Sequence, residues 1–248
     1  MPTPRFILAG TLTRDYYITH DDEPVIDVLG GDVPYAAVGL KVWETDSPPG
    51  LVARVGEDFP QTWLDDLTRR GFDTRGVHIL PENVDMRNFY VYTDKLTRIT
   101  GDPIPHFARL GISFPKALLG YKDTSHALDS RTDLNATSLR QNDIPDAYLD
   151  AAGAHLCPLD FMTHSLMPTV FRQAGVTTIT IDPAPGYMNP TFFNDVPTLM
   201  PGLTAFIPAE DDLRALFEGR TKDLWEMAEA LTNYGCKFVV IKRGERGQ

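Results

Sequence analysis

Glycine turns that follow apolar runs are the features of this sequence that point first to ligand binding. They are Gly10, Gly30-Gly31 and Gly244. In open α/β sheets, ligands bind beyond the carboxyl ends of the strands, and glycine lets the backbone approach a ligand closely. Taken singly, each is explained more simply as a tight turn. The sequence has no Walker A loop, no G-x-G-x-x-G and no G-x-S-x-G, which argues against P-loop kinases, dinucleotide dehydrogenases and α/β-hydrolases.

Composition narrows the classes of partner. The 248 residues suffice for one sizeable core or two small ones, and 23 Lys and Arg against 34 Asp and Glu give a net charge of -11. A surface with this much negative charge repels phosphate backbones and anionic lipids. We therefore expect neither nucleic acid nor a membrane as partner. No run reaches the length of a membrane span or of a signal sequence, which predicts a cytoplasmic protein. Cys157 and Cys236 lie in apolar runs and predict reduced core thiols rather than a disulfide or a metal site.

Short apolar strands alternate with helical patterns along most of the chain. We expect strands over 6–9, 16–19, 25–29, 51–55, 77–80, 88–92, 98–100, 155–157, 176–181, 203–207 and 238–241. We expect helices over 33–43, 59–70, 162–174, 210–217 and 224–234. This rhythm is typical of a parallel sheet covered by helices on both faces, with a small β appendage in the first third. Residues 101–143 are polar and weakly periodic, which predicts a long loop or insertion, and 237–243 predicts a central strand.

Taken together and in order, the turns resemble the ribokinase/PfkB family of sugar and nucleoside kinases. The resemblance covers residue 6 to the end except 101–143, and it implies a ribokinase-like three-layer α/β/α sandwich, with a mostly parallel central sheet and a small β lid over about 15–29 and 87–100. The matching blocks are Phe6-Ile-Leu-Ala-Gly10-Thr-Leu-Thr13-Arg-Asp15, Gly30-Gly31-Asp-Val-Pro-Tyr35-Ala36-Ala37, Val55-Gly56-Glu57-Asp58, Gly71-Phe-Asp73-Thr-Arg-Gly76-Val77, Leu156-Cys-Pro-Leu-Asp160, Ile181-Asp182-Pro183-Ala-Pro185 and Val239-Val-Ile-Lys242-Arg-Gly244-Glu-Arg-Gly247.

The resemblance implies a site for a small-molecule sugar, polyol or nucleoside. A carboxylate such as that of Asp15 can accept two hydroxyl hydrogen bonds and so read a polyol; its alternative role is to cap a turn. Asp160 matches a carboxylate near the substrate, and capping the next helix is the alternative. The substrate-binding residues that we expect are Thr13, Asp15, Gly30, Gly31, Tyr35 and Asp160.

The same resemblance implies ATP and Mg²⁺ as cofactors. Lys242 and Gly244 match positions that line the nucleotide pocket, although Lys242 is also explained as a solvent-exposed lysine at a strand end. Asp182 and Asp212 would help to organise magnesium and phosphates through water, because Mg²⁺ keeps several waters. Capping a turn is the alternative role for Asp182.

Departures from the family pattern bear on activity. Tyr35 stands where many members carry Asn, and Ala209 and Asp212 stand at the ends of the family's N-x-x-E motif, so Glu210 is a further candidate for metal handling. The family's G-A-G-D segment, with its general base and anion hole, is not found up to Gln248. The sequence therefore predicts one ribokinase-like domain over 1–248 that is incomplete at its C-terminus, without a catalytic residue in the chain and without useful kinase activity as written.

Two functions remain open from the sequence. The first is ATP-dependent phosphorylation of a hydroxyl group, and the second is non-catalytic sugar binding or regulation by a relative of these kinases. A nucleotide-binding protein of another family is disfavoured because no other phosphate loop is present. We assign the short strands to a lid whose aromatic face comprises Tyr16, Tyr17, Tyr90 and Tyr92, and we propose a homodimer through this lid; core packing is the alternative role for each tyrosine.

Overall fold

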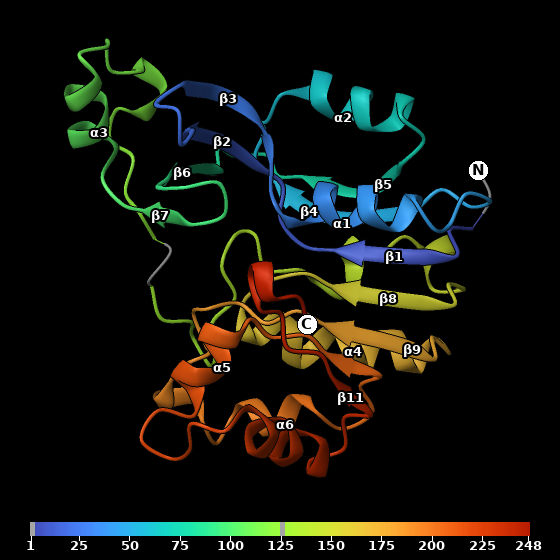
Figure 1. The fold of residues 1–248 in the computed structure, drawn as a ribbon. Helices are drawn as coiled ribbons and strands as arrows, with labels where there is room; N and C mark the ends of the chain where they lie inside the picture. The colour runs from blue at the N-terminus through green and yellow to red at the C-terminus, as the bar shows by residue number, and fades with distance from the viewer. Residues whose placement is uncertain (1–2, 125–126) are drawn as a thin grey trace.

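A seven-stranded parallel sheet forms the centre of the molecule. The computed structural model describes residues 3–124 and 127–248, and its large sheet has the order β11-β10-β9-β8-β1-β4-β5 with every pairing parallel (Figure 1). The strands are β1 (Phe6–Ala9), β4 (Gly50–Val55), β5 (Asp73–Ile79), β8 (Gly153–Leu156), β9 (Thr178–Ile181), β10 (Ala205–Phe206) and β11 (Phe238–Val239). The predicted parallel sheet is confirmed.

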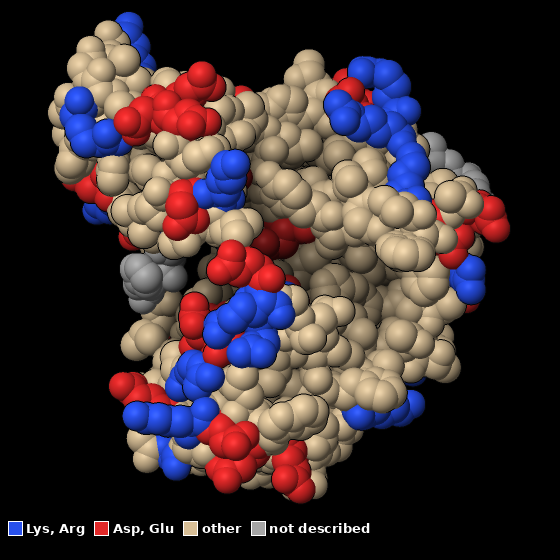
Figure 2. Space-filling view, in the orientation of Figure 1, with Lys and Arg blue, Asp and Glu red and all other residues tan. Residues whose placement is uncertain are grey.

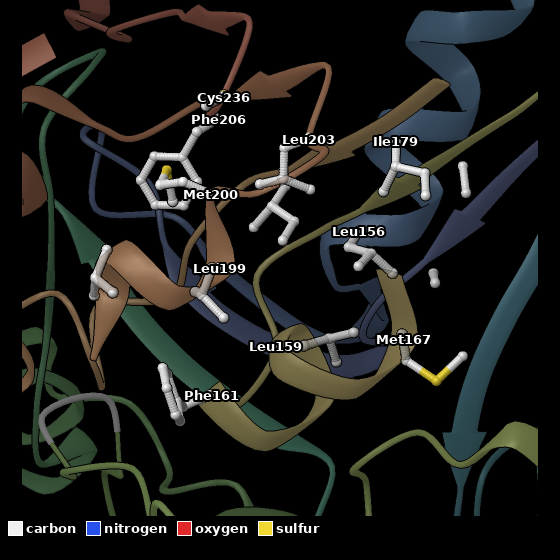
Figure 3. Close-up of a cluster of buried hydrophobic side chains, with 14 of the residues drawn as sticks. Leu156, Leu159, Phe161, Met167, Ile179, Leu199, Met200, Leu203, Phe206 and Cys236 are labelled. Atoms are coloured by element: carbon white, nitrogen blue, oxygen red, sulfur yellow. The ribbon is translucent and has the colours of Figure 1, made fainter. Parts of the chain in front are cut away.

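Helices cover both faces of this sheet. The helices against it are α1 (Asp32–Lys41), α2 (Gln61–Arg69), α4 (Phe161–Gln173), α5 (Glu210–Leu216) and α6 (Leu224–Asn233). One core cluster joins Leu8 and Leu51 of the sheet to Val33 of α1 and Leu64 of α2. The other contains Leu156, Ile179 and Phe206 of the sheet and extends to α4, α5 and α6 (Figure 3). Burial of alternate strand residues toward opposite helical layers produces the three-layer sandwich that the resemblance implies.

A second sheet projects from the edge at which the arrows of β1 and β8 end (Figure 1). Its order is β3-β2-β6-β7, and it comprises β2 (Thr13–Ile18), β3 (Pro24–Gly30), β6 (Arg87–Tyr92) and β7 (Arg98–Thr100). The central pair, β2 and β6, is parallel, whereas the outer pairs are antiparallel. We call this four-stranded sheet the lid sheet.

One face of the lid sheet packs against α3 (Pro103–Leu110), and the other carries a cluster of tyrosine rings. The predicted placement of Tyr16 in that cluster is wrong. Tyr16 packs with Phe89 and with Phe107 of α3 in a small core of its own. Tyr17, Tyr90 and Tyr92 instead form a ring cluster, with Tyr17 and Tyr90 stacked at 5.1 Å between ring centroids. Successive side chains of a strand point to opposite faces, so Tyr16 and Tyr17 cannot share one.

The segment 101–143 is not the structureless loop that its polarity predicts. It contains α3, the 3₁₀ turns η1 (Lys116–Leu118) and η2 (Gln141–Asp143), and extended chain between them. Helix α3 is specified locally: Asp102 accepts a hydrogen bond from the Ile104 N–H, Pro103 occupies the first turn, and Gly111 ends the helix in a left-handed conformation. Helix α3 has only eight residues, so its capping pattern is easily overlooked in a segment that is polar as a whole.

The central strand predicted over 237–243 is also wrong. Strand β11 has two residues and lies at the edge of the sheet within the described chain, and a single bridge joins Lys242 to Ala209 farther on. The pairing is short because β10 offers only two residues in register. The remaining 3₁₀ turns are η3 (Asp146–Tyr148), η4 (Pro190–Phe192), η5 (Val196–Leu199) and η6 (Gly244–Arg246).

Two further expectations can be compared with the structure. Cys157 and Cys236 are free and buried, which confirms the prediction of reduced core thiols. Across residues 3–124 and 127–248, no helix combines the length and the apolar character that crossing a bilayer requires.

Candidate ligand-binding cleft

The carboxyl ends of the central strands meet at one edge of the large sheet. Gly10 follows β1, Cys157 follows β8 and Asp182 follows β9, and these strands are parallel neighbours. A Cβ added at Gly10 would lie 2.6 Å from Cys157 Cβ, so the first two loops are in close contact. Figure 2 shows a hollow at this edge, between the lid sheet and the C-terminal part of the chain, with acidic atoms on its floor and basic side chains on its lower rim. This hollow is the candidate cleft.

Asp15 is a buried polar group beside the cleft. It lies on β2 and is only 3% exposed. Its Oδ1 accepts hydrogen bonds from Thr13 Oγ1 at 2.6 Å and from Asn88 Nδ2 at 3.3 Å, and its Oδ2 accepts one from the Tyr90 hydroxyl at 3.0 Å. A buried carboxylate with three donors is held in one orientation, so Asp15 does not serve as the simple turn cap that the sequence left open.

Gly30 and Gly31 connect Asp15 to helix α1. A Cβ at Gly30 would lie 2.1 Å from Asp15 Cγ, so only a hydrogen atom fits between this backbone and the carboxylate. Gly31 has φ 96° and precedes α1, where the Val33 N–H donates to Thr11 O at 3.3 Å. A positive φ of this kind favours glycine. The structure therefore brings Thr13, Asp15, Gly30 and Gly31 together, as the resemblance implies.

Tyr35 lies on the first turn of α1 and is 66% exposed. Partial burial of this side chain raises its pKa, and the charges of Asp15, Tyr17 and Tyr92 raise it further. Tyr35 therefore faces the Asp15 side of the cleft rather than the core, and core packing is excluded as its role.

Asp160 follows β8 at the same edge, but its carboxylate is engaged elsewhere. It caps α4: Oδ1 accepts the Thr163 N–H at 2.9 Å, and Oδ2 accepts the Thr163 hydroxyl at 2.7 Å. The capping alternative that the sequence allowed for Asp160 is thus what the structure shows. Within the part of the chain that the structure describes, Asp160 and Asp15 have no hydrogen-bond partner in common.

Asp129 occupies the neighbouring position at the start of α4. Its Oδ2 accepts the Phe161 N–H at 3.0 Å, and its own N–H donates to Gly186 O at 3.1 Å. Burial raises the pKa of Asp129 to about 6, and the nearby Asp160 carboxylate raises it as well. The segment 127–143 is thereby joined to the end of β8 and to the loop after β9.

Replacement of Asp129 by Asn should stabilise the protein at neutral pH. The native pKa lies above the ordinary value of 3.8, so the unfolding free energy falls as the pH rises from about 4 to about 6, and the penalty persists above that range. Asn keeps an acceptor for the Phe161 N–H but cannot ionise. We expect Asp129→Asn to gain about 1 to 2 kcal/mol at pH 7.5 and nothing at pH 4.0, measured by urea unfolding. Equal stability of the two proteins at pH 7.5 would contradict this prediction.

A second polar group lies toward the C-terminal side of the cleft. Lys242 Nζ forms an ion pair with Asp182 Oδ2. Burial raises the pKa of Asp182, and Lys242 opposes this shift. Burial raises the pKa of Asp212 to about 6; Lys242 lowers it, and Asp182 and Asp211 add to the rise. Asp182, Asp212 and Lys242 therefore lie close enough to influence one another's charge.

Glu210 and Gly244 are related in a way that the sequence did not predict. Glu210 accepts hydrogen bonds from Arg243 and Arg214 at 2.9 Å and from Arg246 at 2.8 Å. Arg243 and Arg214 are the main reason why the pKa of Glu210 falls to about 2. Gly244 starts η6, the turn that carries Arg246. Three arginines already neutralise this carboxylate, which argues against metal handling by Glu210.

Sequence reasoning missed several residues of the cleft. Asn88 and Tyr90 contact Asp15, and Asp32 accepts a hydrogen bond from the Thr11 hydroxyl at 3.1 Å. Burial raises the pKa of Asp32, and the charge of Asp182 adds to the rise. Asn88, Tyr90 and Tyr92 alternate along a strand, and this pattern could have placed them on one face of the lid sheet. The strand with which they pair is not evident from the sequence.

The segment 101–143 contributes to a cavity beside Asp15. The lining of this cavity of about 230 Å³ includes Thr11, Thr13 and Asn88 together with Tyr121 and Thr137 of that segment. Residues that sequence analysis left without a role thus share a cavity with Thr13, one of the predicted substrate residues.

Similarity to known proteins is found both in sequence and in fold. No protein-family model matches the sequence. The cytidine kinase of Thermococcus kodakarensis is 25% identical over 249 aligned positions, which cover 97% of this chain and 73% of that protein.

Three solved structures are similar over nearly the whole chain. A PfkB protein from Polaromonas sp. JS666 has a TM-score of 0.60 at 17% identity, with 98% of this chain and 81% of that chain covered. The nucleoside kinase of Burkholderia thailandensis, solved in complex with inosine, has a TM-score of 0.59 at 15% identity and coverages of 97% and 70%. The fructokinase of Xylella fastidiosa with bound ATP has a TM-score of 0.59 at 15% identity and coverages of 96% and 72%. This chain therefore has the ribokinase-like fold, and its resemblance to the ribokinase/PfkB family of carbohydrate and nucleoside kinases is confirmed.

Proposed function

We propose that this chain binds a sugar, polyol or nucleoside beside Asp15, and that its reaction is phosphoryl transfer from ATP to a hydroxyl group of that compound. The observation that carries the proposal is the contact of the Asp15 carboxylate with the Gly30 backbone at the base of the lid sheet. A buried, oriented carboxylate is a strong acceptor for substrate hydroxyls, and orientation of the acceptor hydroxyl is a principal requirement of phosphoryl transfer. The kinase relatives support the same reaction.

The nucleotide is proposed to bind across the cleft, near Lys242, Asp182, Asp212 and Gly244. Lys242 would interact with donor phosphates, and the ATP-bound fructokinase supports ATP as the donor. Among residues 3–124 and 127–248, no three acidic, His or Cys side chains are grouped as metal ligands. Asp182 and Asp212 nevertheless fit a magnesium ion held through water, because the raised pKa of Asp212 marks a carboxyl group that a nearby cation would stabilise in its charged form.

A nucleoside is the substrate class that we favour among the three. The relatives include a cytidine kinase and a nucleoside kinase that binds inosine. The lid sheet presents the ring cluster of Tyr17, Tyr90 and Tyr92 next to Asp15, and aromatic rings are suitable surfaces for a nucleobase.

A binding screen tests the acceptor site directly. Cytidine, inosine, ribose, fructose and myo-inositol would each be added to the 248-residue protein, and we expect the two nucleosides to raise its melting temperature by about 2 to 5 °C at saturating concentration, since binding to the native state stabilises it. The Asp15→Asn variant is the control, because it removes the proposed acceptor. A screen without any shift for the wild-type protein would reject the proposed site.

Turnover is a separate question from binding. We propose that the polypeptide of 248 residues binds its substrate without useful turnover, because its sequence contains no G-A-G-D segment to supply the base and the anion hole. Loss of a general base alone costs about two to four orders of magnitude in rate. ADP release that depends on both ATP and a nucleoside, at an ordinary kinase rate, would overturn this part of the proposal.

Binding without catalysis is the second candidate function. It is favoured by the Asp182–Lys242 ion pair and by Ala209 in the N-x-x-E position, because both reduce the groups free to handle magnesium. We also propose that residues 1–248 form one ribokinase-like domain and that the protein forms a homodimer through the lid sheet. A monomeric mass in light scattering would count against the homodimer.

A further inference from the structure

The hydrogen bonds of Asp15 leave little of its carboxylate unused. An ionised carboxylate has about four acceptor positions. Three of them are taken by the side chains of Thr13, Asn88 and Tyr90, two on Oδ1 and one on Oδ2. Among residues 3–124 and 127–248, no side chain donates to the second position on Oδ2, and we assign this position to the ligand.

The carboxylate cannot easily turn to offer more. The Gly30 backbone lies against it, so closely that a Cβ there would meet Oδ2 at 2.2 Å and Oδ1 at 2.3 Å. Asp15 is also paired within the lid sheet on both sides, with Val28 of β3 and Asn88 of β6. Backbone pairing and the absence of space both fix its orientation.

Tyr90 is itself held in place. Its ring stacks on Tyr17 with 3° between the ring planes and meets the Tyr92 ring edge-on at 5.6 Å. The Arg98 guanidinium lies over the Tyr90 ring at 5.1 Å from the centroid. Burial, together with the Asp15 charge, holds the pKa of Tyr90 well above its ordinary value, so the phenol is a neutral donor at any working pH. Displacing its hydroxyl would require breaking this ring cluster.

We infer that Tyr90 determines specificity by occupying one acceptor position of Asp15, so that the site reads a single substrate hydroxyl rather than a vicinal pair. This inference rests on the proposed function, because it concerns how the same acceptor site recognises its ligand. It differs from the expectation that Asp15 accepts two hydroxyl hydrogen bonds.

Deoxy analogues distinguish one hydroxyl contact from two. Cytidine, 2′-deoxycytidine and 3′-deoxycytidine would be titrated into the wild-type protein by calorimetry. We expect one deoxy analogue to bind within about threefold of cytidine and the other at least about tenfold more weakly, because a hydrogen bond to a charged group contributes roughly a factor of ten or more. Weakening of about tenfold or more for both analogues in the wild-type protein would overturn the inference.

The Tyr90→Phe variant tests the assigned residue. It keeps the ring and releases the second acceptor position, so both deoxy analogues should now bind about tenfold or more weakly relative to cytidine. Tyr234→Phe is the matched control: it also removes one hydroxyl, but from an exposed tyrosine at the end of α6, so it should keep the wild-type pattern. An unchanged pattern in Tyr90→Phe would overturn the inference while leaving the proposed function standing.

Two further outcomes are failure of the variant to fold and failure of the wild-type protein to bind. If Tyr90→Phe does not fold, the analogue pattern of the wild-type protein alone decides between one and two hydroxyl contacts. If the wild-type protein binds none of the three compounds, the proposed nucleoside site is rejected, and this inference is rejected with it.

Discussion

The Gly31→Ala variant should lose about 3 kcal/mol or more of unfolding free energy. Gly31 has φ 96° and ψ 166°, a conformation that side chains disfavour. The new Cβ would also lie 2.3 Å from Thr11 O and 2.8 Å from Leu12 Cα, both backbone atoms that cannot move independently. Relief would require α1 to shift away from the end of β1. Urea unfolding followed by circular dichroism measures the loss.

Gly39→Ala, in the helix that Gly31 precedes, is the matched control. Gly39 lies inside α1, and nothing lies within 4 Å of the Cβ that the substitution adds. Alanine is a better helix former than glycine, so we expect a gain of about 0.5 to 1 kcal/mol. The two substitutions add the same atom, one just before α1 and one inside it, and should change stability in opposite directions. Similar effects of both would show that the Gly31 conformation is not a requirement of this fold.

Sequence information located the strands well because their signal is local. A run such as that of β1 is apolar on both faces and followed by glycine, a pattern that does not depend on the neighbours it meets. The proximity of Asp15 and Gly30 was predictable only through the resemblance, since a turn of unknown geometry separates the two residues. The parallel sheet then placed their loops at one edge without further information.

The remainder of the site depends on contacts between distant residues. Asn88 and Tyr90 reach Asp15 across 73 and 75 residues of sequence, through a parallel pairing of β2 with β6 that no local pattern indicates. The error at Tyr16 has the same origin, because the face of a strand is assigned only when its neighbours are known. Asp160 is the opposite case. A local pattern, Asp-x-x-Thr at the start of a helix, accounts for the hydrogen bonds of its carboxylate without any ligand.

Replacement of Asp15 by Asn should weaken substrate binding about 10- to 100-fold, with little effect on the fold. The amide keeps the shape of the carboxylate but has one acceptor oxygen instead of two and loses the charge. Its NH₂ group would face a donor, either the Tyr90 hydroxyl or the pair formed by Thr13 and Asn88. The acceptor position left for the ligand is therefore lost or reoriented. Calorimetric titration with cytidine measures the change in affinity.

Asp160→Asn is the informative comparison, because both acids were predicted to contact the substrate. Asn is as good a helix cap as Asp, so this variant should keep the hydrogen bond from the Thr163 N–H, and we expect affinity to change less than about threefold. An equal loss in the two variants would mean that the start of α4 also contacts the ligand. A loss confined to Asp160→Asn would move the acceptor site away from the lid sheet, and the role proposed for Tyr90 would then be untenable.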